Sequence, residues 1–380
     1  MKNIPNILIM GATGKLGTML LNFCNKESIK ISAITCFKDN IKLKKLKNKF
    51  KIKNSYTLSF SDDHSNFLNF LKKNKIDIVY FLDVGSSSLF YLNHFLKFQR
   101  NSLICIANKE MIIAGGKFIN ENIKKNKCKL IPLDSEHFSL INNNFKAIDI
   151  KKILITASGG PFYFKKKINL NKVSKAKVLS HPKWKMGSNN LIDSSNFVNK
   201  ILEIFELTYI YDIPFEKIDF VVSKEAFVHS IIFYRDSTIS LNCFTNDMLI
   251  TLTKPLRNFF DFDLEDKFSK IYHIDNFKLE IFNDKRFAIN KYFKKISNFN
   301  HNQQILFMIL NNFAQKLYLN NKLKYNEILN FVFKQIELFD SYRLIKLRNF
   351  KEILKFVNDI NVDIKSKNLW KLLYFFFFSL

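Results

Sequence analysis

Short apolar segments alternate with helical stretches through the first third of the chain. The segments cover residues 7–10, 31–35, 76–82, 103–107 and 129–133. This alternation is typical of a parallel β-sheet whose strands are joined by covering helices. The pattern therefore predicts an α/β fold that begins with a Rossmann-like domain over residues 1–136.

The pattern changes after this first domain. Strands are predicted at 153–157 and 220–222, with a helix at 195–208 between them, so residues 137–257 form an α+β domain. Beyond a linker at 258–285, apolar residues recur at helical spacing, which predicts a C-terminal α-helical bundle over residues 286–380. Its expected helices cover residues 302–319, 325–338 and 344–357.

The charge changes this picture little. The chain has 60 Lys and Arg against 33 Asp and Glu, a formal net charge of +27. Such a charge can attract nucleic acid, membrane surfaces or small anions. Here lysines occur in almost every segment, and only 9 glycines and 6 prolines are present, which indicates a general residue bias. No nucleic-acid partner is expected.

Cysteine spacing and apolar runs indicate the compartment. The five cysteines are far apart, so the sequence holds no C-x-x-C zinc or redox pattern. The first residues lack a signal-peptide core, and the longest apolar run, 372–380, is far below the roughly 20 residues of a membrane helix. We expect a cytoplasmic protein without a membrane segment, whose last residues dock in a core.

A glycine turn follows the first strand. Residues 11–17 read GATGKLG, and a helical stretch comes next. Glycines in this position let the backbone approach a pyrophosphate at the helix N-terminus. Lys15 is not followed by Ser or Thr, so the P-loop pattern is absent. After the second strand, Lys38 favours the 2′-phosphate of NADPH, whereas the neighbouring Asp39 would suit NADH.

An acidic pair follows the strand at 129–133. If the chain stays extended, Asp134 and Glu136 point to one side, as a divalent Mg²⁺ or Mn²⁺ site requires. On the helix after residue 195, Asn199 and Lys200 lie one turn before Glu203. Phosphate held by Ser194, Asn199 and Lys200 would then lie near a metal held by Glu203. Glu206 suits the geometry equally, and an ordinary surface helix is the alternative.

Two loops complete the candidate chemistry. Ser158 is followed by Gly159 and Gly160, whose backbone N–H groups can surround an anion. His181 and Trp184 lie in a polar loop that is either a surface anchor or a lid over the substrate. No G-x-S-x-G elbow accompanies the serines, which disfavours a hydrolase.

Six motifs together resemble, in order and spacing, the signatures of 1-deoxy-D-xylulose 5-phosphate reductoisomerases. They are GATGKLG, ANKE (107–110), PLDSEH (132–137), TASGGPF (156–162), HPKWKMG (181–187) and DSSNFVNKILE (193–203). The resemblance covers essentially the whole chain. It implies an NADPH-binding domain, a catalytic domain with a lid, a C-terminal helical domain and a homodimer. The implied reaction rearranges and reduces 1-deoxy-D-xylulose 5-phosphate to 2-C-methyl-D-erythritol 4-phosphate, an isoprenoid precursor.

The resemblance also implies roles for individual residues. Asp134, Glu136 and Glu203 would bind Mg²⁺ or Mn²⁺. Lys109 and Ser135 would lie near the reacting part of the substrate. Further substrate contacts would come from Glu136, Ser158, His181, Trp184, Ser194, Asn199, Lys200 and Glu203. NADPH would contact Thr13, Gly14, Lys15, Leu16, Lys38, Asn40, Asn108, Lys109, Glu110, Gly187 and Met248.

The chain departs from the family pattern at several places. They include residues 36–40 after the second strand, Ser188 and Asn189 after the lid glycine, residues 223–225, and Leu249 after Met248. Most fall outside the expected metal and phosphate residues, so an active enzyme is predicted. The alternative is a catalytically decayed homologue that binds nucleic acid through its charge, with strongly salt-dependent affinity.

Overall fold

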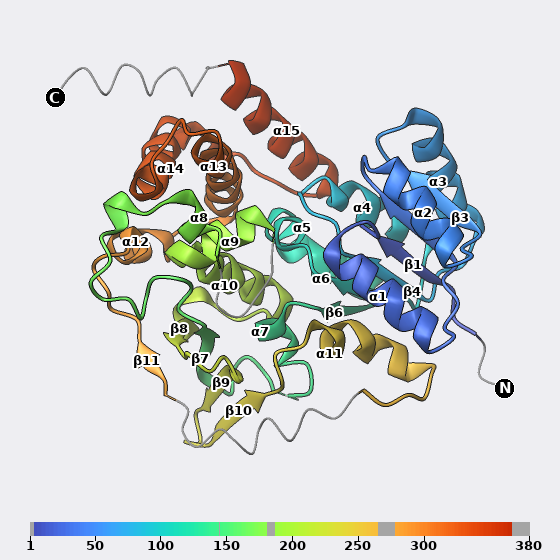
Figure 1. Ribbon diagram of the computed structural model, residues 1–380, viewed down its shortest axis with the longest axis horizontal. Helices are drawn as coiled ribbons and strands as arrows, with labels where there is room; N and C mark the ends of the chain where they lie inside the picture. The colour runs from blue at the N-terminus through green and yellow to red at the C-terminus, as the bar shows by residue number, and fades with distance from the viewer. Residues whose placement is uncertain (1–3, 144, 181–186, 265–277, 367–380) are drawn as a thin grey trace. The chain divides into compact units, whose positions relative to one another are not determined.

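The computed structural model describes residues 4–143, 145–180, 187–264 and 278–366 (Figure 1). The chain forms two compact units. The first combines Met1–Lys146 with Asn242–Asp275, and the second combines Ala147–Leu241 with Asn276–Leu380. The first unit is therefore interrupted in sequence by part of the second.

A six-stranded parallel sheet forms the centre of the first unit, in the order β3-β2-β1-β4-β5-β6. This order is typical of dinucleotide-binding folds. Strands β1, β2 and β4 are buried along their whole length, and β1 and β4 are accordingly continuous apolar runs. The strands are β1 (Ile7–Met10), β2 (Ala33–Cys36), β3 (Asn54–Thr57), β4 (Ile78–Phe81), β5 (Leu103–Ile106) and β6 (Lys129–Pro132).

Helices connect these strands. They are α1 (Lys15–Lys26), α2 (Asn40–Lys49), α3 (Ser61–Lys73), α4 (Ser88–Phe98), α5 (Lys109–Gly115), α6 (Lys117–Lys125) and α7 (Ser135–Phe138). A later segment returns as α11 (Met248–Thr253) and a 3₁₀ turn (Lys254–Asn258). The Tyr80 hydroxyl donates to the carbonyl oxygen of Leu252 at 2.9 Å, and Leu252 joins the core beneath α1. The predicted Rossmann-like domain is confirmed.

The second unit contains a mixed five-stranded sheet in the order β10-β9-β7-β8-β11. Strand β7 pairs parallel with β8 and antiparallel with β9. The mixed pairing confirms the predicted α+β character of this region. The strands are β7 (Ile150–Ala157), β8 (Ile218–Val222), β9 (Val228–Tyr234), β10 (Ile239–Cys243) and β11 (Glu280–Ile281).

Helices make up the rest of the second unit, and Figure 1 shows α13 and α14 side by side. The helices are α8 (Lys175–Val178), α9 (Ser188–Asn196), α10 (Val198–Tyr211), α12 (Ala288–Ile296), α13 (His301–Leu319), α14 (Ile328–Leu338) and α15 (Phe350–Ser366). Short 3₁₀ turns lie at Leu170–Lys172, Phe215–Lys217, Tyr325–Glu327 and Asp340–Leu344. In the described part of the chain, no helix is both long and apolar enough to cross a membrane.

Three sequence expectations differ from these elements. Strand β3 was not predicted, because its residues Asn-Ser-Tyr-Thr are polar and mostly half-buried. The helix expected at 344–357 begins at Phe350, after a 3₁₀ turn. The helix expected at 195–208 is interrupted at Phe197. The docking predicted for residues 372–380 lies outside the described residues.

Candidate functional site

The glycine turn lies at the carboxyl end of β1. Gly11 has φ +79°, and a Cβ there would lie 2.5 Å from the backbone nitrogen of Asp83, so only glycine fits. Thr13 and Gly14 follow, and α1 begins at Lys15 and Leu16 without a side-chain cap. Backbone N–H groups at such a helix start are suited to an anion. The predicted cofactor residues 13–16 therefore share one turn of the expected kind.

The start of α2 lies next along the sheet edge. Asp39 caps this helix, because its carboxylate accepts from the backbone N–H of Lys42 at 3.0 Å. The ammonium of Lys42 donates to the carbonyl oxygen of Thr13 at 2.6 Å. Asp39 thus has a structural role, while Lys38 is exposed and Asn40 bonds Thr57. Lys42 was not singled out from the sequence, since any surface lysine of α2 shows the same pattern.

The ANKE segment follows β5 and holds a neighbouring loop. The Asn108 amide donates to the carbonyl oxygen of Gly85 at 3.0 Å, and the Glu110 carboxylate accepts from the N–H of Gly85 at 2.5 Å. Asp83 begins this loop and accepts from the Ser88 hydroxyl. Burial raises the pKa of the Asp83 carboxyl to about 6, while hydrogen bonds from Ser88 and Asn108 oppose the rise.

Asp134 and Glu136 follow β6. Asp134 is extended and is the N-cap of the one-turn helix α7, so the extended geometry on which the prediction depended does not continue to Glu136. The two carboxylates nevertheless approach each other, with oxygens within 4.8 Å. The Ser135 hydroxyl donates to Glu136 at 2.5 Å, and the ammonium of Lys109 pairs with Asp134. Oxygen donors at this spacing suit a hard divalent cation.

Met248 is the first residue of α11 in the same unit. Asp247 caps that helix through the N–H of Leu249 at 3.0 Å. The bond between Tyr80 and Leu252 fixes α11 to β4. Met248, the predicted nicotinamide contact, therefore lies on a helix that is hydrogen-bonded to the parallel sheet of the first unit.

In the second unit, a helix break lies between the candidate residues Ser194 and Asn199. Phe197 has φ +66°, a left-handed conformation, and it separates α9 from α10. Ser194 lies in the last turn of α9, and Gly187 is the N-cap of that helix. The region around residue 195 is thus a helix end, whereas the sequence predicted a helix start. Asn199 and Lys200 lie in the first turn of α10.

Glu203 is buried on α10 and bonds two predicted phosphate residues. The Lys200 ammonium donates to one carboxylate oxygen at 2.5 Å, and the Asn199 amide donates to the other. The prediction that these three residues share one helix face is confirmed. Glu206 is buried one turn further on.

Ser158 follows β7 and begins a tight turn. Gly159 and Gly160 have φ +83° and +55°. A Cβ on Gly160 would lie 2.7 Å from the carbonyl oxygen of Ser194, so the turn packs backbone to backbone against the end of α9. The structure therefore brings Ser158 and Ser194, two predicted phosphate residues, into neighbouring segments. His181 and Trp184, predicted in the lid, lie outside the described residues.

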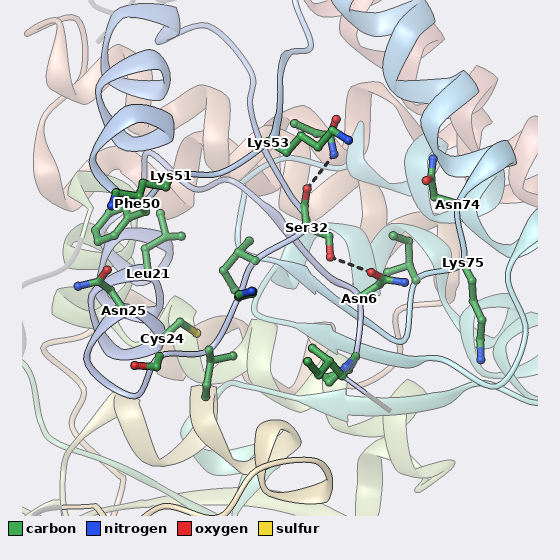
Figure 2. Close-up of a pocket in the computed structure, with 18 of the residues that line it drawn as sticks. Asn6, Leu21, Cys24, Asn25, Ser32, Phe50, Lys51, Lys53, Asn74 and Lys75 are labelled. Atoms are coloured by element: carbon green, nitrogen blue, oxygen red, sulfur yellow. Dashed lines mark hydrogen bonds between the residues drawn. The ribbon is translucent and has the colours of Figure 1, made fainter. Parts of the chain in front are cut away.

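A groove at the opposite edge of the parallel sheet differs from these sites. Figure 2 shows Asn6, Ser32, Lys53 and Lys75 around it, each at or just before the amino end of a strand. The Ser32 hydroxyl donates to the Asn6 amide oxygen at 3.1 Å. Cofactors of open α/β folds bind at the carboxyl ends of the strands, so this groove is not the dinucleotide site.

The chain is similar to known proteins along its length. Residues 130–211 match the model of the 1-deoxy-D-xylulose 5-phosphate reductoisomerase C-terminal domain. The 1-deoxy-D-xylulose 5-phosphate reductoisomerase of Pelagibacter ubique (strain HTCC1062) is 30% identical over 391 residues, which cover 96% of this chain and 100% of that protein. The chain belongs to the 1-deoxy-D-xylulose 5-phosphate reductoisomerase family. The predicted family is confirmed.

Further relatives of this family agree. The reductoisomerase of Clostridium novyi (strain NT) is 29% identical over 96% of this chain and 99% of that protein. The Zymomonas mobilis reductoisomerase, solved in complex with NADPH, has a TM-score of 0.81 at 20% identity and full coverage of both chains. A DOX-P reductoisomerase solved with NADPH, fosmidomycin and magnesium has a TM-score of 0.82 at 21% identity, covering 97% of this chain and 99% of that one. These likenesses confirm the predicted fold class.

Proposed function

We propose that this reductoisomerase binds its catalytic metal through Asp134, Glu136 and Glu203 and its substrate phosphate through Ser158, Ser194, Asn199 and Lys200. The protein is an NADPH-dependent enzyme that converts 1-deoxy-D-xylulose 5-phosphate to 2-C-methyl-D-erythritol 4-phosphate. Its cofactors are NADPH and a divalent cation, Mg²⁺ or Mn²⁺. The observation that carries the site is the carboxylate pair after β6, with oxygens within 4.8 Å.

The donor set fits a divalent cation. Three carboxylates supply only oxygen ligands, which Mg²⁺ and Mn²⁺ prefer over the nitrogen and sulfur sites of softer metals. When bound, such a cation polarises the substrate's carbonyl and hydroxyl oxygens and orients them. Lysines lie against two of the ligands, Lys109 on Asp134 and Lys200 on Glu203. These lysines neutralise part of the negative charge of the two carboxylates.

The remaining residues bind and orient. Ser135, beside Glu136, would contact the reacting part of the substrate together with Lys109, whose ammonium can stabilise a developing oxyanion. Ser158 and Ser194 offer hydroxyl donors, and Asn199 and Lys200 offer an amide and an ammonium at the start of α10, where the helix dipole favours phosphate. His181 and Trp184 would close over the substrate and exclude water.

NADPH would lie along the carboxyl edge of the parallel sheet. The turn of Thr13, Gly14, Lys15 and Leu16 would hold its pyrophosphate. Lys38 and Asn40 would contact the 2′-phosphate, and Met248 the nicotinamide. The remaining proposed contacts are Asn108, Lys109, Glu110 and Gly187.

The division into residues 1–136, 137–257, 258–285 and 286–380 stays a prediction, with metal and substrate assigned to the second part. A cytoplasmic location is our proposal, supported by five cysteines that are all free thiols. Fractionation of cells that produce the protein tests it, because recovery with secreted proteins would contradict it.

We also propose a homodimer. Strand β10 is an edge of the mixed sheet and exposes Ile239 (54%) and Leu241 (49%) on one face. An exposed apolar edge strand favours pairing with another chain, here a second copy. Light scattering should give twice the chain mass, and Leu241→Lys should shift it towards the monomer. A monomeric wild type would contradict this proposal.

The activity is tested by following NADPH oxidation by the purified protein. We expect oxidation only when 1-deoxy-D-xylulose 5-phosphate and Mg²⁺ or Mn²⁺ are both present, and none after chelation of the metal. Protein that binds NADPH but shows no metal-dependent oxidation with that substrate would contradict the assignment.

A further inference from the structure

Arg286 lies between β11 and α12, and all five N–H groups of its guanidinium have acceptors. Nε and one N–H of Nη2 donate to the carboxylate of Asp284 at 3.0 and 2.7 Å. The rest donate to backbone carbonyl oxygens: Nη2 to Tyr163 at 3.0 Å, and Nη1 to Lys165 at 2.9 Å and Lys166 at 3.3 Å. A guanidinium has five such donors, so Arg286 has none left for a ligand.

The carbonyl groups that Arg286 holds belong to the turn that begins at Ser158. The N–H of Tyr163 donates to the carbonyl oxygen of Gly159 at 3.2 Å, so the held segment folds back on the glycines. Gly160 in turn packs against the backbone of Ser194. The guanidinium therefore holds the later residues of the turn, Tyr163 to Lys166, while the earlier residue Gly160 contacts the end of α9.

An aromatic cluster joins the same turn to the helix break at Phe197. The rings of Tyr163 and Phe287 lie 5.8 and 4.9 Å from the Phe197 ring, and Phe282 lies 4.4 Å away. A non-glycine residue in the left-handed region costs about 1 kcal/mol or more, so its surroundings must hold it. Arg286 donates to the backbone of Tyr163 and immediately precedes Phe287 in sequence. It is therefore linked to two of the residues whose rings contact Phe197.

We propose that Arg286 is a positioning residue for the phosphate subsite. It holds the Ser158 turn against Ser194 and supports the helix break that presents Asn199 and Lys200. The inference rests on the proposed function of these four residues. A lysine has only three N–H donors and no planar fork, so it cannot bond Asp284 and three carbonyl groups together.

The test uses the full chain with Arg286→Gln and Arg286→Lys. We expect Arg286→Gln to raise the KM for the sugar phosphate, and the Kd for inorganic phosphate measured by calorimetry, about tenfold or more, because small misplacement of binding groups is costly. Arg286→Lys should show a smaller loss, and the Kd for NADPH should not change. Arg343→Gln is the matched control, since it removes the same charge from an exposed site of the same unit.

Several outcomes would overturn the proposal. One is a folded Arg286→Gln protein with unchanged phosphate affinity and unchanged KM, and another is an equal loss in Arg343→Gln, which would indicate net charge alone. If Arg286→Gln does not fold, Arg286→Lys decides, and unchanged phosphate affinity there contradicts the proposal. A wild type without metal-dependent NADPH oxidation would defeat the proposed function instead, while the phosphate titrations still test Arg286.

Discussion

Each unit places a lysine against a proposed metal ligand, but the two pairs are built differently. Lys109 begins α5 after β5, Asp134 is the N-cap of α7 after the neighbouring β6, and their side chains are 15% and 21% exposed. Lys200 and Glu203 are three residues apart on α10, and their side chains are 8% and 2% exposed. The sheet thus brings together residues distant in sequence at a partly open edge, whereas the helix buries a local pair.

This difference predicts unequal costs of removing the lysine. Lys200→Met should destabilise the protein by about 3 kcal/mol, because it takes a cation from a buried carboxylate. Lys109→Met should cost about 1 kcal/mol, since water can reach Asp134. Urea unfolding of both variants beside the wild type measures the difference. Equal losses would show that burial does not distinguish the two pairs.

Asp83 extends the comparison to a third carboxylate, near the glycine turn. Burial raises its pKa to about 6, so the folded protein binds this proton more tightly than the unfolded chain does. Ionisation therefore removes stability as pH rises from about 4 to about 6, up to about 3 kcal/mol. The free energy of unfolding of Asp83→Asn should therefore increase relative to that of the wild type across that pH range. A stability difference that stays constant with pH would contradict the expected shift.

Glycines sharpen the contrast between the sheet edge and the helical region. Gly11→Ala combines positive φ with backbone 2.5 Å away and should cost about 2 kcal/mol or more, with weaker NADPH binding. A Cβ on Gly187 meets nothing within 4 Å, so Gly187→Ala should cost under about 1 kcal/mol. That cost comes from the preference for glycine over alanine at the N-cap of a helix. Thermal unfolding ranks the two variants, and a reversed order would argue against the tight turn.

A small effect, confined to stability, is expected at the start of α13. Asn300 and Gln303 form a capping box there. Asn300→Ala should cost about 1 kcal/mol and leave the KM of the substrate unchanged, because the lost bonds, with the N–H of Gln303 and the carbonyl oxygen of Arg343, both lie at the helix end. Unfolding and steady-state kinetics on one preparation test both parts. A raised KM would mean that the proposed phosphate residues depend on this helix end.

Local spacing was enough to predict part of the fold and site. Strands β1, β4 and β5 are continuous apolar runs. Glu203 shares a helix face with Asn199 and Lys200 because residues three and four apart on a helix lie on the same side. Strand β3 is polar and so lacks an apolar run that would predict it. It is the edge strand of the parallel sheet and pairs with β2.

Other features depend on contacts that no local pattern carries. The break at Phe197 is one, because phenylalanine does not favour positive φ and a distant aromatic cluster stabilises it. The approach of Lys109 to Asp134 requires the pairing of β5 with β6. Arg286 acts on a turn about 120 residues earlier in the chain, so its role could not be found before the fold was known.

The central claim is that Asp134 and Glu203 bind the same divalent cation. A titration of Mn²⁺ into the wild type, Asp134→Asn, Glu203→Gln and the double variant tests it directly. We predict one Mn²⁺ per wild-type chain and affinity about tenfold or more weaker in each single variant, with losses that are not additive in the double variant. Unchanged Mn²⁺ affinity in either single variant, or strictly additive losses, would contradict the claim.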